Sequence, residues 1–137
     1  MNAQTSEQVS ERMKRIKGKD TAPEIVVRSL CHRLGFRFRL HVKALPGSPD
    51  IVFPRLKKII FVHGCFWHRH GRRCKRTSIP QTNKEFWINK FMENAARDKR
   101  NLIALRKKGW KVKIIWECEI RNNQELEIKI FNYLNYK

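Results

Sequence analysis

The chain lacks any long apolar stretch. In the 137-residue sequence, no apolar run approaches the ~20 residues that are needed to span a bilayer. The first residues are polar and contain no hydrophobic core of a signal peptide, so we expect a cytoplasmic protein with reduced cysteines. Internal repeats and low-complexity segments are also missing, and the length suits one domain. We therefore predict a single domain over residues 1–137, with no membrane partner.

Acidic residues are scarce. Asp and Glu total 12 against 31 Lys and Arg, which leaves a formal net charge of +19. The basic residues are spread along the whole sequence, and dense phosphates reward many such contacts through counterion release. Nucleic acid is thus the expected partner, and a membrane surface is the weaker alternative.

The N-terminal part predicts an arm followed by a helix. Residues 1–19 are basic and polar, and we interpret them as a DNA-contacting arm or a short amphipathic helix that orders on its ligand. Thr21-Ala-Pro-Glu24 is a capping-box pattern that begins a helix ending at Gly35. The apolar stripe of that helix consists of Val27, Leu30, Cys31 and Leu34.

Alternation and turn signals predict an α/β order of elements. A second capping box, Thr82-Asn-Lys-Glu85, predicts a long helix up to Gly109. The last helix should bury Leu126, Ile130, Phe131 and Leu134. The expected strands are 36–40, 50–53, 58–63 and 111–116, with a long loop over 64–81 and the last helix at about 124–136.

Four residues are candidate ligands of a structural zinc ion. They are Cys65, His70, Cys74 and Cys118. Three thiolates and one imidazole match a closed tetrahedral site, and their softness favours zinc over magnesium. Alternatively they are unrelated reduced cysteines, because no tight C-x2-C pair is present, and His68 could replace His70. Cys31 lies on an apolar helix stripe and is interpreted as core.

Four other residues are candidates for phosphodiester chemistry. Asp50 follows a proline at a strand start, which suits a carboxylate ligand of Mg²⁺. His63 and His68 could activate water or protonate a leaving oxygen, and Asp98 could orient one of them. The simpler alternatives are that Asp50 caps a turn and that Asp98 belongs to a solvated helix face.

Aromatic residues form a third group. Phe66 and Trp67 lie between the zinc candidates, and Trp87 lies in the first turn of the long helix. On a basic protein, exposed aromatics can insert between bases or stack on them. Alternatively these side chains pack over the zinc loop. Met13 and Ile16 could act as minor-groove wedges or form an ordinary amphipathic stripe.

Several separated motifs occur together in a fixed order. They are Met13-Lys-Arg-Ile16, Asp20-Thr-Ala-Pro-Glu24, Leu45-Pro-Gly-Ser-Pro-Asp-Ile-Val52, Ile60-Phe-Val-His-Gly-Cys-Phe-Trp-His-Arg-His70, Thr82-Asn-Lys-Glu-Phe-Trp87, Ala96-Arg-Asp98, Gly109-Trp-Lys-Val112 and Ile115-Trp-Glu-Cys118. Over roughly residues 12–121 the chain closely resembles the very-short-patch (Vsr) mismatch repair endonucleases. His63 stands where the wider restriction-enzyme motif, Pro-Asp followed by acid-x-Lys, has its second acid, which indicates a histidine-using branch or an altered mechanism.

The resemblance implies a fold and an activity. The fold would be restriction-endonuclease-like, of PD-(D/E)xK type, with a central mixed β-sheet flanked by helices and a structural zinc site. The activity would be a strand-specific nick on the 5′ side of the thymine in T:G mismatches that arise when 5-methylcytosine deaminates. The implied partner is double-stranded DNA, with the protein a monomer associated with the bacterial nucleoid. Whether mismatch-repair factors are also partners stays open.

The resemblance also implies roles for individual residues. Asp50 would bind Mg²⁺ together with the backbone carbonyl of Val62, and Glu24 would lie close to the metal. His63 and His68 would be catalytic, with Asp98 as their supporting acid. Structural Zn²⁺ would be held by Cys65, His70, Cys74 and Cys118. DNA would be intercalated by Phe66, Trp67, Trp87, Met13 and Ile16.

Two other functions fit the same residues. One is a related nuclease that acts on another mismatch or on branched DNA. The other is a zinc-stabilised DNA-binding module without enzymatic activity, in which Asp50 is incidental.

Overall fold

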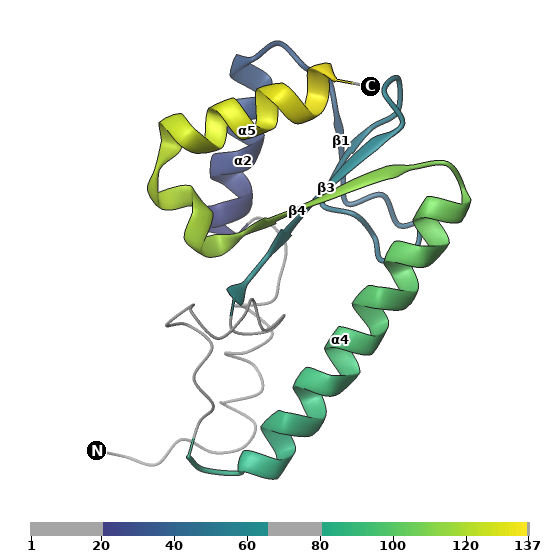
Figure 1. Cartoon of the computed structure of the whole chain (residues 1–137), viewed down its shortest axis with the longest axis vertical. Coiled ribbons are helices and arrows are strands. Elements are labelled where there is room, and N and C mark those ends of the chain that lie inside the picture. The colour runs from purple at the N-terminus through teal and green to yellow at the C-terminus, as the bar shows by residue number, and fades with distance from the viewer. Residues whose placement is uncertain (1–20, 66–80, 137) are drawn as a thin grey trace.

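The computed structural model of the chain describes residues 21–65 and 81–136 (Figure 1). Its core is a four-stranded sheet in the order β1-β2-β3-β4. The strands are β1 (Arg39–Leu40), β2 (Ile51–Phe53), β3 (Lys58–His63) and β4 (Lys111–Trp116). The helices are α2 (Ala22–Arg33), α4 (Lys84–Lys107), the short 3-10 helix η2 (Glu117–Arg121) and α5 (Asn123–Asn135).

The sheet is mixed. β1, β2 and β3 form antiparallel pairs, whereas β3 and β4 run parallel, with His63 paired to Trp116 at their carboxyl ends. A parallel pair needs a long crossover connection, and that connection contains α4. This mixed α/β architecture is compatible with the restriction-endonuclease-like fold that the sequence suggests.

Helices cover both faces of the sheet (Figure 1). On one face α2 and α5 pack against alternate strand residues, including Ile51, Phe53 and Ile60. On the other face Leu105 of α4 packs with Val52 and Ile59. The period of two along each strand therefore divides the apolar residues between two core clusters.

The C-terminal helix is anchored to the sheet by polar contacts. The Tyr133 hydroxyl lies 2.9 Å from the carbonyl oxygens of both Ile59 and Lys111. The buried Lys58 side chain donates to the backbone carbonyls of Tyr133 and Tyr136, where α5 ends. Burial, and then repulsion from Lys111, lower the pKa of Lys58. These contacts attach α5 to β3 and β4 beyond what its apolar face provides.

Several predicted elements differ in their details. α2 begins as expected, with Thr21 as N-cap accepting from the Glu24 N–H at 3.4 Å. The predicted strand 36–40 is shorter, because only Arg39–Leu40 pairs with β2. The capping box predicted at the start of α4 is wrong: Asn83 is the N-cap, in a left-handed conformation, and its side chain makes no capping hydrogen bond.

The core stripe of α5 was predicted with one residue too many. Leu126, Ile130 and Leu134 are buried as expected, whereas Phe131 is 48% exposed. The three buried residues follow each other at intervals of four, and Phe131 lies about 100° around the helix from Ile130. Within the described ranges, no helix is long and apolar enough to cross a membrane.

Candidate active site

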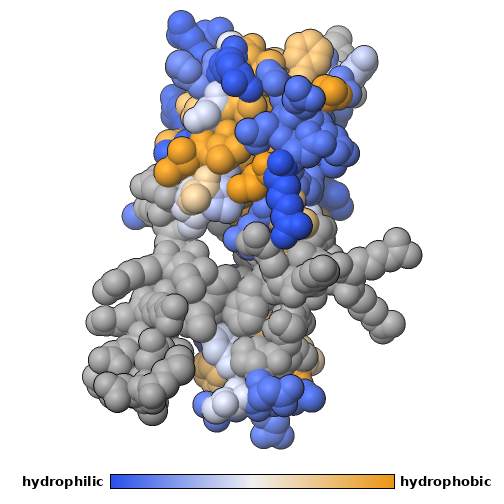
Figure 2. Space-filling model, turned by 90° about the vertical axis from the view of Figure 1, so that its left-hand side faces the viewer, coloured by the Kyte–Doolittle hydropathy of each residue, from blue (hydrophilic) through white to orange (hydrophobic). Residues whose placement is uncertain are grey.

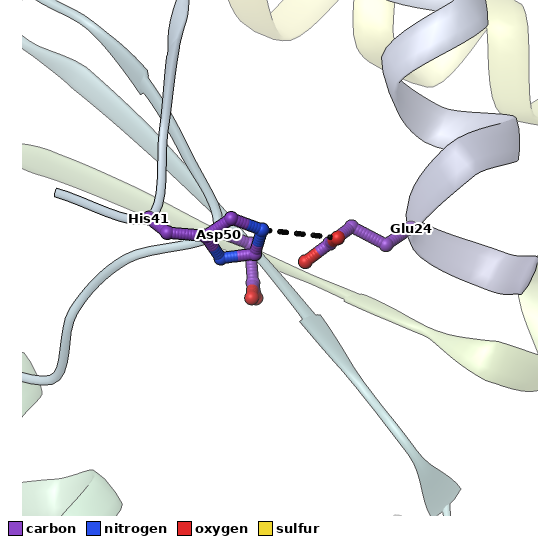
Figure 3. A group of neighbouring side chains, drawn as sticks. All are labelled: Glu24, His41 and Asp50. Carbon is purple, nitrogen blue, oxygen red and sulfur yellow. Dashed lines mark ion pairs between the residues drawn. The ribbon is translucent and has the colours of Figure 1, made fainter. Parts of the chain in front are cut away.

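Three ionisable side chains from separate elements meet beside the sheet (Figure 3). They are Glu24 of α2, His41 just after β1, and Asp50 just before β2. Their potential ligand atoms all lie within 4.8 Å of one another. The His41 Nε2 atom is 3.3 Å from Glu24 Oε2.

Backbone pairing determines where Asp50 lies. β1 and β2 are antiparallel, and the ladder continues past their ends, with the His41 N–H donating to the Asp50 carbonyl at 3.2 Å. On the other side, the backbone N–H of Val62 donates to Asp50 Oδ2 at 2.8 Å. Asp50 is therefore fixed from both sides of β2, by its backbone carbonyl toward β1 and by its carboxylate toward β3.

The carboxylate of Glu24 is buried, with only 3% of the residue exposed. Arg28, one turn later on α2, contacts its Oε2 atom at 2.6 Å. His41 approaches the same oxygen, so two basic side chains surround Glu24. A charged hydrogen bond of this kind offsets part of the cost of burying a carboxylate.

Asp50 is in an environment that disfavours its charged form. Burial, which is the largest cause, raises the pKa of Asp50 to about 7. The Val62 hydrogen bond acts in the opposite direction, while the neighbouring Glu24 carboxyl raises the pKa further and Arg28 lowers it. Two carboxyl groups that repel each other in a buried place are stabilised in the ionised form by a cation.

The donor set fits a divalent cation. Two carboxylates offer hard oxygen ligands of the kind that Mg²⁺ and Mn²⁺ prefer, and the imidazole adds a nitrogen that Mn²⁺ accepts. Asp50 and Glu24 are the residues that could hold such an ion. The predicted role of the Val62 carbonyl as a further ligand stays a prediction.

The predicted catalytic histidine His63 is the last residue of β3, one position after Val62, whose N–H contacts Asp50. His63 shares the sheet face of Phe61, whose ring centroid is 5.6 Å from its own. Trp116 covers it edge-on at 5.3 Å, and His63 is 7% exposed. Asp98 belongs to α4, the helix on that same face, and is partly buried. Leu105 of α4 packs on that face of the sheet, and the support of His63 by Asp98 stays a prediction.

The two described zinc candidates lie at one edge of the sheet. Cys65 and Cys118 each follow the paired residues His63 and Trp116 by two positions, and the two strands are parallel. Cys65 is fully buried. His70 and Cys74 lie outside the described residues, as does the catalytic candidate His68. Cys31 is fully buried in the core, as interpreted, and burial raises the pKa of its thiol to about 12.

Among the intercalation candidates, only Trp87 lies in the described ranges. It is 8% exposed and stacks on Phe91 with ring centroids 6.1 Å apart. In this structure its ring is thus packed on Phe91, while its packing over the zinc loop and its DNA role both stay predictions. The neighbouring Phe86 is 53% exposed instead. The candidates Phe66, Trp67, Met13 and Ile16 lie outside the described residues.

Sequence reasoning missed His41. A signal was available, because the antiparallel pairing of 36–40 with 50–53 continues by one step to bring position 41 opposite position 50. A histidine directly after an alternating strand and opposite a candidate metal ligand is therefore a candidate itself.

Comparisons with known proteins give the family. The sequence model of the family described as DNA mismatch endonuclease Vsr matches residues 1–76. The chain is 46% identical over 123 residues to Type II nicking enzyme V.XorIIP of Xanthomonas oryzae pv. oryzae, which covers 90% of this chain and 89% of that protein. It is 41% identical over 117 residues to the DNA mismatch endonuclease Vsr of Escherichia coli, covering 85% of this chain and 74% of that protein. These matches confirm the resemblance seen in the sequence motifs, and the chain belongs to the Vsr family of DNA endonucleases.

Proposed function

We propose that this endonuclease nicks one DNA strand on the 5′ side of the thymine in a T:G mismatch, using Mg²⁺ and histidine-assisted hydrolysis. The observation that carries the proposal is the convergence of Glu24, His41 and Asp50 beside the strand that ends in His63. The mismatch substrate is supported by the Escherichia coli relative, which is named a DNA mismatch endonuclease. Deamination of 5-methylcytosine produces this mismatch, so a cytosine methyltransferase is the expected genetic companion.

Each described residue has a separate task in this mechanism. Asp50 and Glu24 would hold Mg²⁺, which when bound polarises the scissile phosphate and offsets the charge that develops on it. The Val62 N–H orients the Asp50 carboxylate, and Arg28 fixes the Glu24 carboxylate. These contacts keep both oxygen donors in place before the cation and DNA arrive.

Proton transfer is assigned to histidines. His63 and His68 would take a proton from the attacking water and give one to the leaving oxygen. The buried, aromatic surroundings of His63 restrict its ring, and Asp98 would accept one of its N–H groups. A ring held in one orientation keeps the same nitrogen directed toward the group with which it exchanges a proton.

A zinc ion is proposed for the edge of the sheet beyond β3 and β4. Cys65, His70, Cys74 and Cys118 would hold it, and it would attach the segment after β3 to the segment after β4. The parallel pairing of His63 with Trp116 supports this, because Cys65 and Cys118 each follow that pair by two residues. The ion would have a structural role, since four protein ligands leave no open position.

DNA contact is proposed for the basic surface and the aromatic residues. The net charge of +19 supports a strongly salt-dependent interaction with phosphates. Phe66, Trp67 and Trp87 would insert beside the mismatch, with Met13 and Ile16 approaching from the other groove. Because Trp87 is packed in this structure, its insertion would require it to leave Phe91.

Cleavage of defined duplexes tests the proposal. Oligonucleotides with a T:G mismatch, each other mismatch, a paired control and a branched junction are incubated with the protein and Mg²⁺, and nicked products are mapped on a gel. We expect one nick 5′ of the mismatched thymine. Protein that binds T:G duplexes with Mg²⁺ in many sequence contexts and never nicks them would contradict the proposal.

Asp50→Asn provides the matched variant. It removes the charge and keeps the shape, so cleavage should fall by at least about a thousandfold while the fold is retained. Glu127→Gln, on the far helix α5 beside Arg33, is the control and should cut normally. If the Asp50→Asn variant cleaves as well as wild type, Asp50 has no role in catalysis.

A related nuclease with another substrate is the second candidate. Several relatives are named Type II nicking enzymes rather than mismatch endonucleases, which favours a range of substrates in the family. The same panel distinguishes the two, because only the preferred duplex is nicked at low protein concentration. A DNA-binding module without catalysis would nick none of them, with or without Asp50.

A further inference from the structure

We propose that His41 supplies a nitrogen ligand to the divalent cation held by Glu24 and Asp50, so that this site favours Mn²⁺ over Mg²⁺. The proposal rests on the proposed function and deepens it, since it concerns the same site. The sequence motifs assign His41 no role, and it enters the site only through the fold.

The distances fit direct ligation. Adjacent donors of an octahedral ion with bonds of about 2.1 Å lie roughly 3 Å apart, and opposite donors lie roughly 4.2 Å apart. His41 Nε2 is 3.3 Å from Glu24 Oε2, and all three ligand atoms lie within 4.8 Å of one another. Small side-chain movements would therefore bring Glu24, His41 and Asp50 onto one ion (Figure 3).

The backbone holds the imidazole near the carboxylates. The His41 N–H donates to the Asp50 carbonyl at 3.2 Å, and the next ladder bond joins Val42 to Pro49 at 3.3 Å. His41 has a positive φ of 49°, and its side chain is only 14% exposed. Two potential ligands thus come from directly paired backbone positions, so the main chain holds the two residues side by side.

A positioning role is the alternative for His41. In that case its contact with Glu24 only orients the carboxylate, as Arg28 does from the other side. Loss of His41 would then weaken the binding of Mn²⁺ and of Mg²⁺ to the same extent. Direct ligation predicts a different result, because Mn²⁺ accepts imidazole readily whereas Mg²⁺ prefers oxygen. The ratio of the two affinities therefore distinguishes the roles.

Cation binding to the full chain, without added DNA, tests the proposal. Mn²⁺ and Mg²⁺ are titrated separately into wild type, His41→Gln and His41→Asn by calorimetry, after removal of unbound divalent ions by desalting. Gln supplies an oxygen in place of the nitrogen, and Asn tolerates the left-handed backbone at this position. His32→Gln, an exposed position on α2, is the matched control.

We expect both His41 variants to bind Mn²⁺ at least about tenfold more weakly and His41→Gln to bind Mg²⁺ within about twofold of wild type. Pulsed EPR of bound Mn²⁺ should show nitrogen coupling in wild type and His32→Gln, and none in the His41 variants. Nitrogen coupling that persists in these variants, or an equal loss of both affinities, would overturn the proposal.

Asp50→Asn separates this proposal from the proposed function. If Asp50→Asn loses cation binding while His41→Gln keeps it with nitrogen coupling unchanged, only the role of His41 is refuted. If neither variant changes Mn²⁺ binding, the cation does not bind in this group, and the metal assignment of the proposed function fails with it.

Discussion

The Asp50 carboxylate accepts a hydrogen bond from the backbone N–H of Val62 at 2.8 Å. This single contact joins the start of β2 to the end of β3, directly before His63. The proposed metal ligand and the proposed proton-transfer residue are therefore related through rigid main chain rather than through flexible side chains. Such preorganisation is what in-line phosphoryl chemistry requires of its ligands.

The stability of the protein without divalent cations should depend on the charge of Asp50. Its pKa is about 7 in the folded protein, above the ordinary value of 3.8, so the folded state binds the proton more tightly than the unfolded state. This contribution to stability is fully present below about pH 4 and is lost as the pH rises to about 7. Asp50→Asn should thus be more stable than wild type at pH 8, on the order of a few kcal/mol.

Urea unfolding at a series of pH values measures this difference. The advantage of Asp50→Asn should shrink steadily between pH 8 and pH 5. Saturating Mg²⁺ or Mn²⁺ should stabilise wild type but not the variant, because only the ionised carboxylate binds a cation. A variant that is less stable than wild type at every pH would contradict the prediction.

The zinc assignment predicts a loss of metal in single cysteine variants. Cys118→Ser and Cys65→Ser should each lower the zinc content well below the expected value of about one ion per chain. Elemental analysis of desalted protein gives this value directly. Cys31→Ala is the control, because this thiol lies in the core among Val27 and Leu30, and the variant should keep its zinc.

Tyr133→Phe should destabilise the attachment of α5. Its hydroxyl lies within hydrogen-bond distance of two main-chain carbonyls, and burial raises its pKa to about 12, so it stays protonated as a donor. Removing it should lower the free energy of unfolding by about 1–3 kcal/mol in urea denaturation. Tyr136→Phe should change it little, because Tyr136 is 70% exposed.

Trp87 should matter for stability as well as for DNA. Trp87→Ala removes a buried ring that stacks on Phe91 and should cost roughly 3 kcal/mol, whereas Phe86→Ala at an exposed site should cost much less. Thermal melting compares the two variants.

The proposed insertion of Trp87 requires a variant that keeps the packing. Trp87→Phe retains an aromatic ring but offers a smaller stacking surface, so we expect weaker binding to mismatched duplex by about fivefold and a smaller change for paired duplex. Fluorescence anisotropy of labelled duplexes measures both affinities. If the affinities for both duplexes fall equally, Trp87 has only a packing role.

The local sequence patterns predicted most elements of the fold. Alternation predicted β3 and β4 with their observed bounds, and the spacing of apolar residues predicted α2 and α5 within one residue at each end. Other details depended on context: Phe131 is apolar but faces solvent, and Phe36 and Phe38 pack on the core without joining β1. An apolar side chain can be buried, but the packing of neighbouring elements determines whether it is buried.

The candidate site divides in the same way. Asp50 and His63 could be chosen from the sequence, because each is an ionisable residue at the end of an apolar strand. His41 could be chosen only by extending the antiparallel pairing of 36–40 with 50–53 by one step, which places it opposite Asp50.

The sequence by itself determined the family, the basic charge and the chemical types of the candidate ligands, because these depend only on which residues are present and in what order. The tertiary structure decided which ligands meet. Glu24 and Asp50 are 26 positions apart in the chain, and α2 and β2 bring their carboxylates together with His41 around one point. Electrostatic and coordination energies decrease over a few ångströms of separation. The distances between side chains therefore determine the chemistry, and the fold determines these distances.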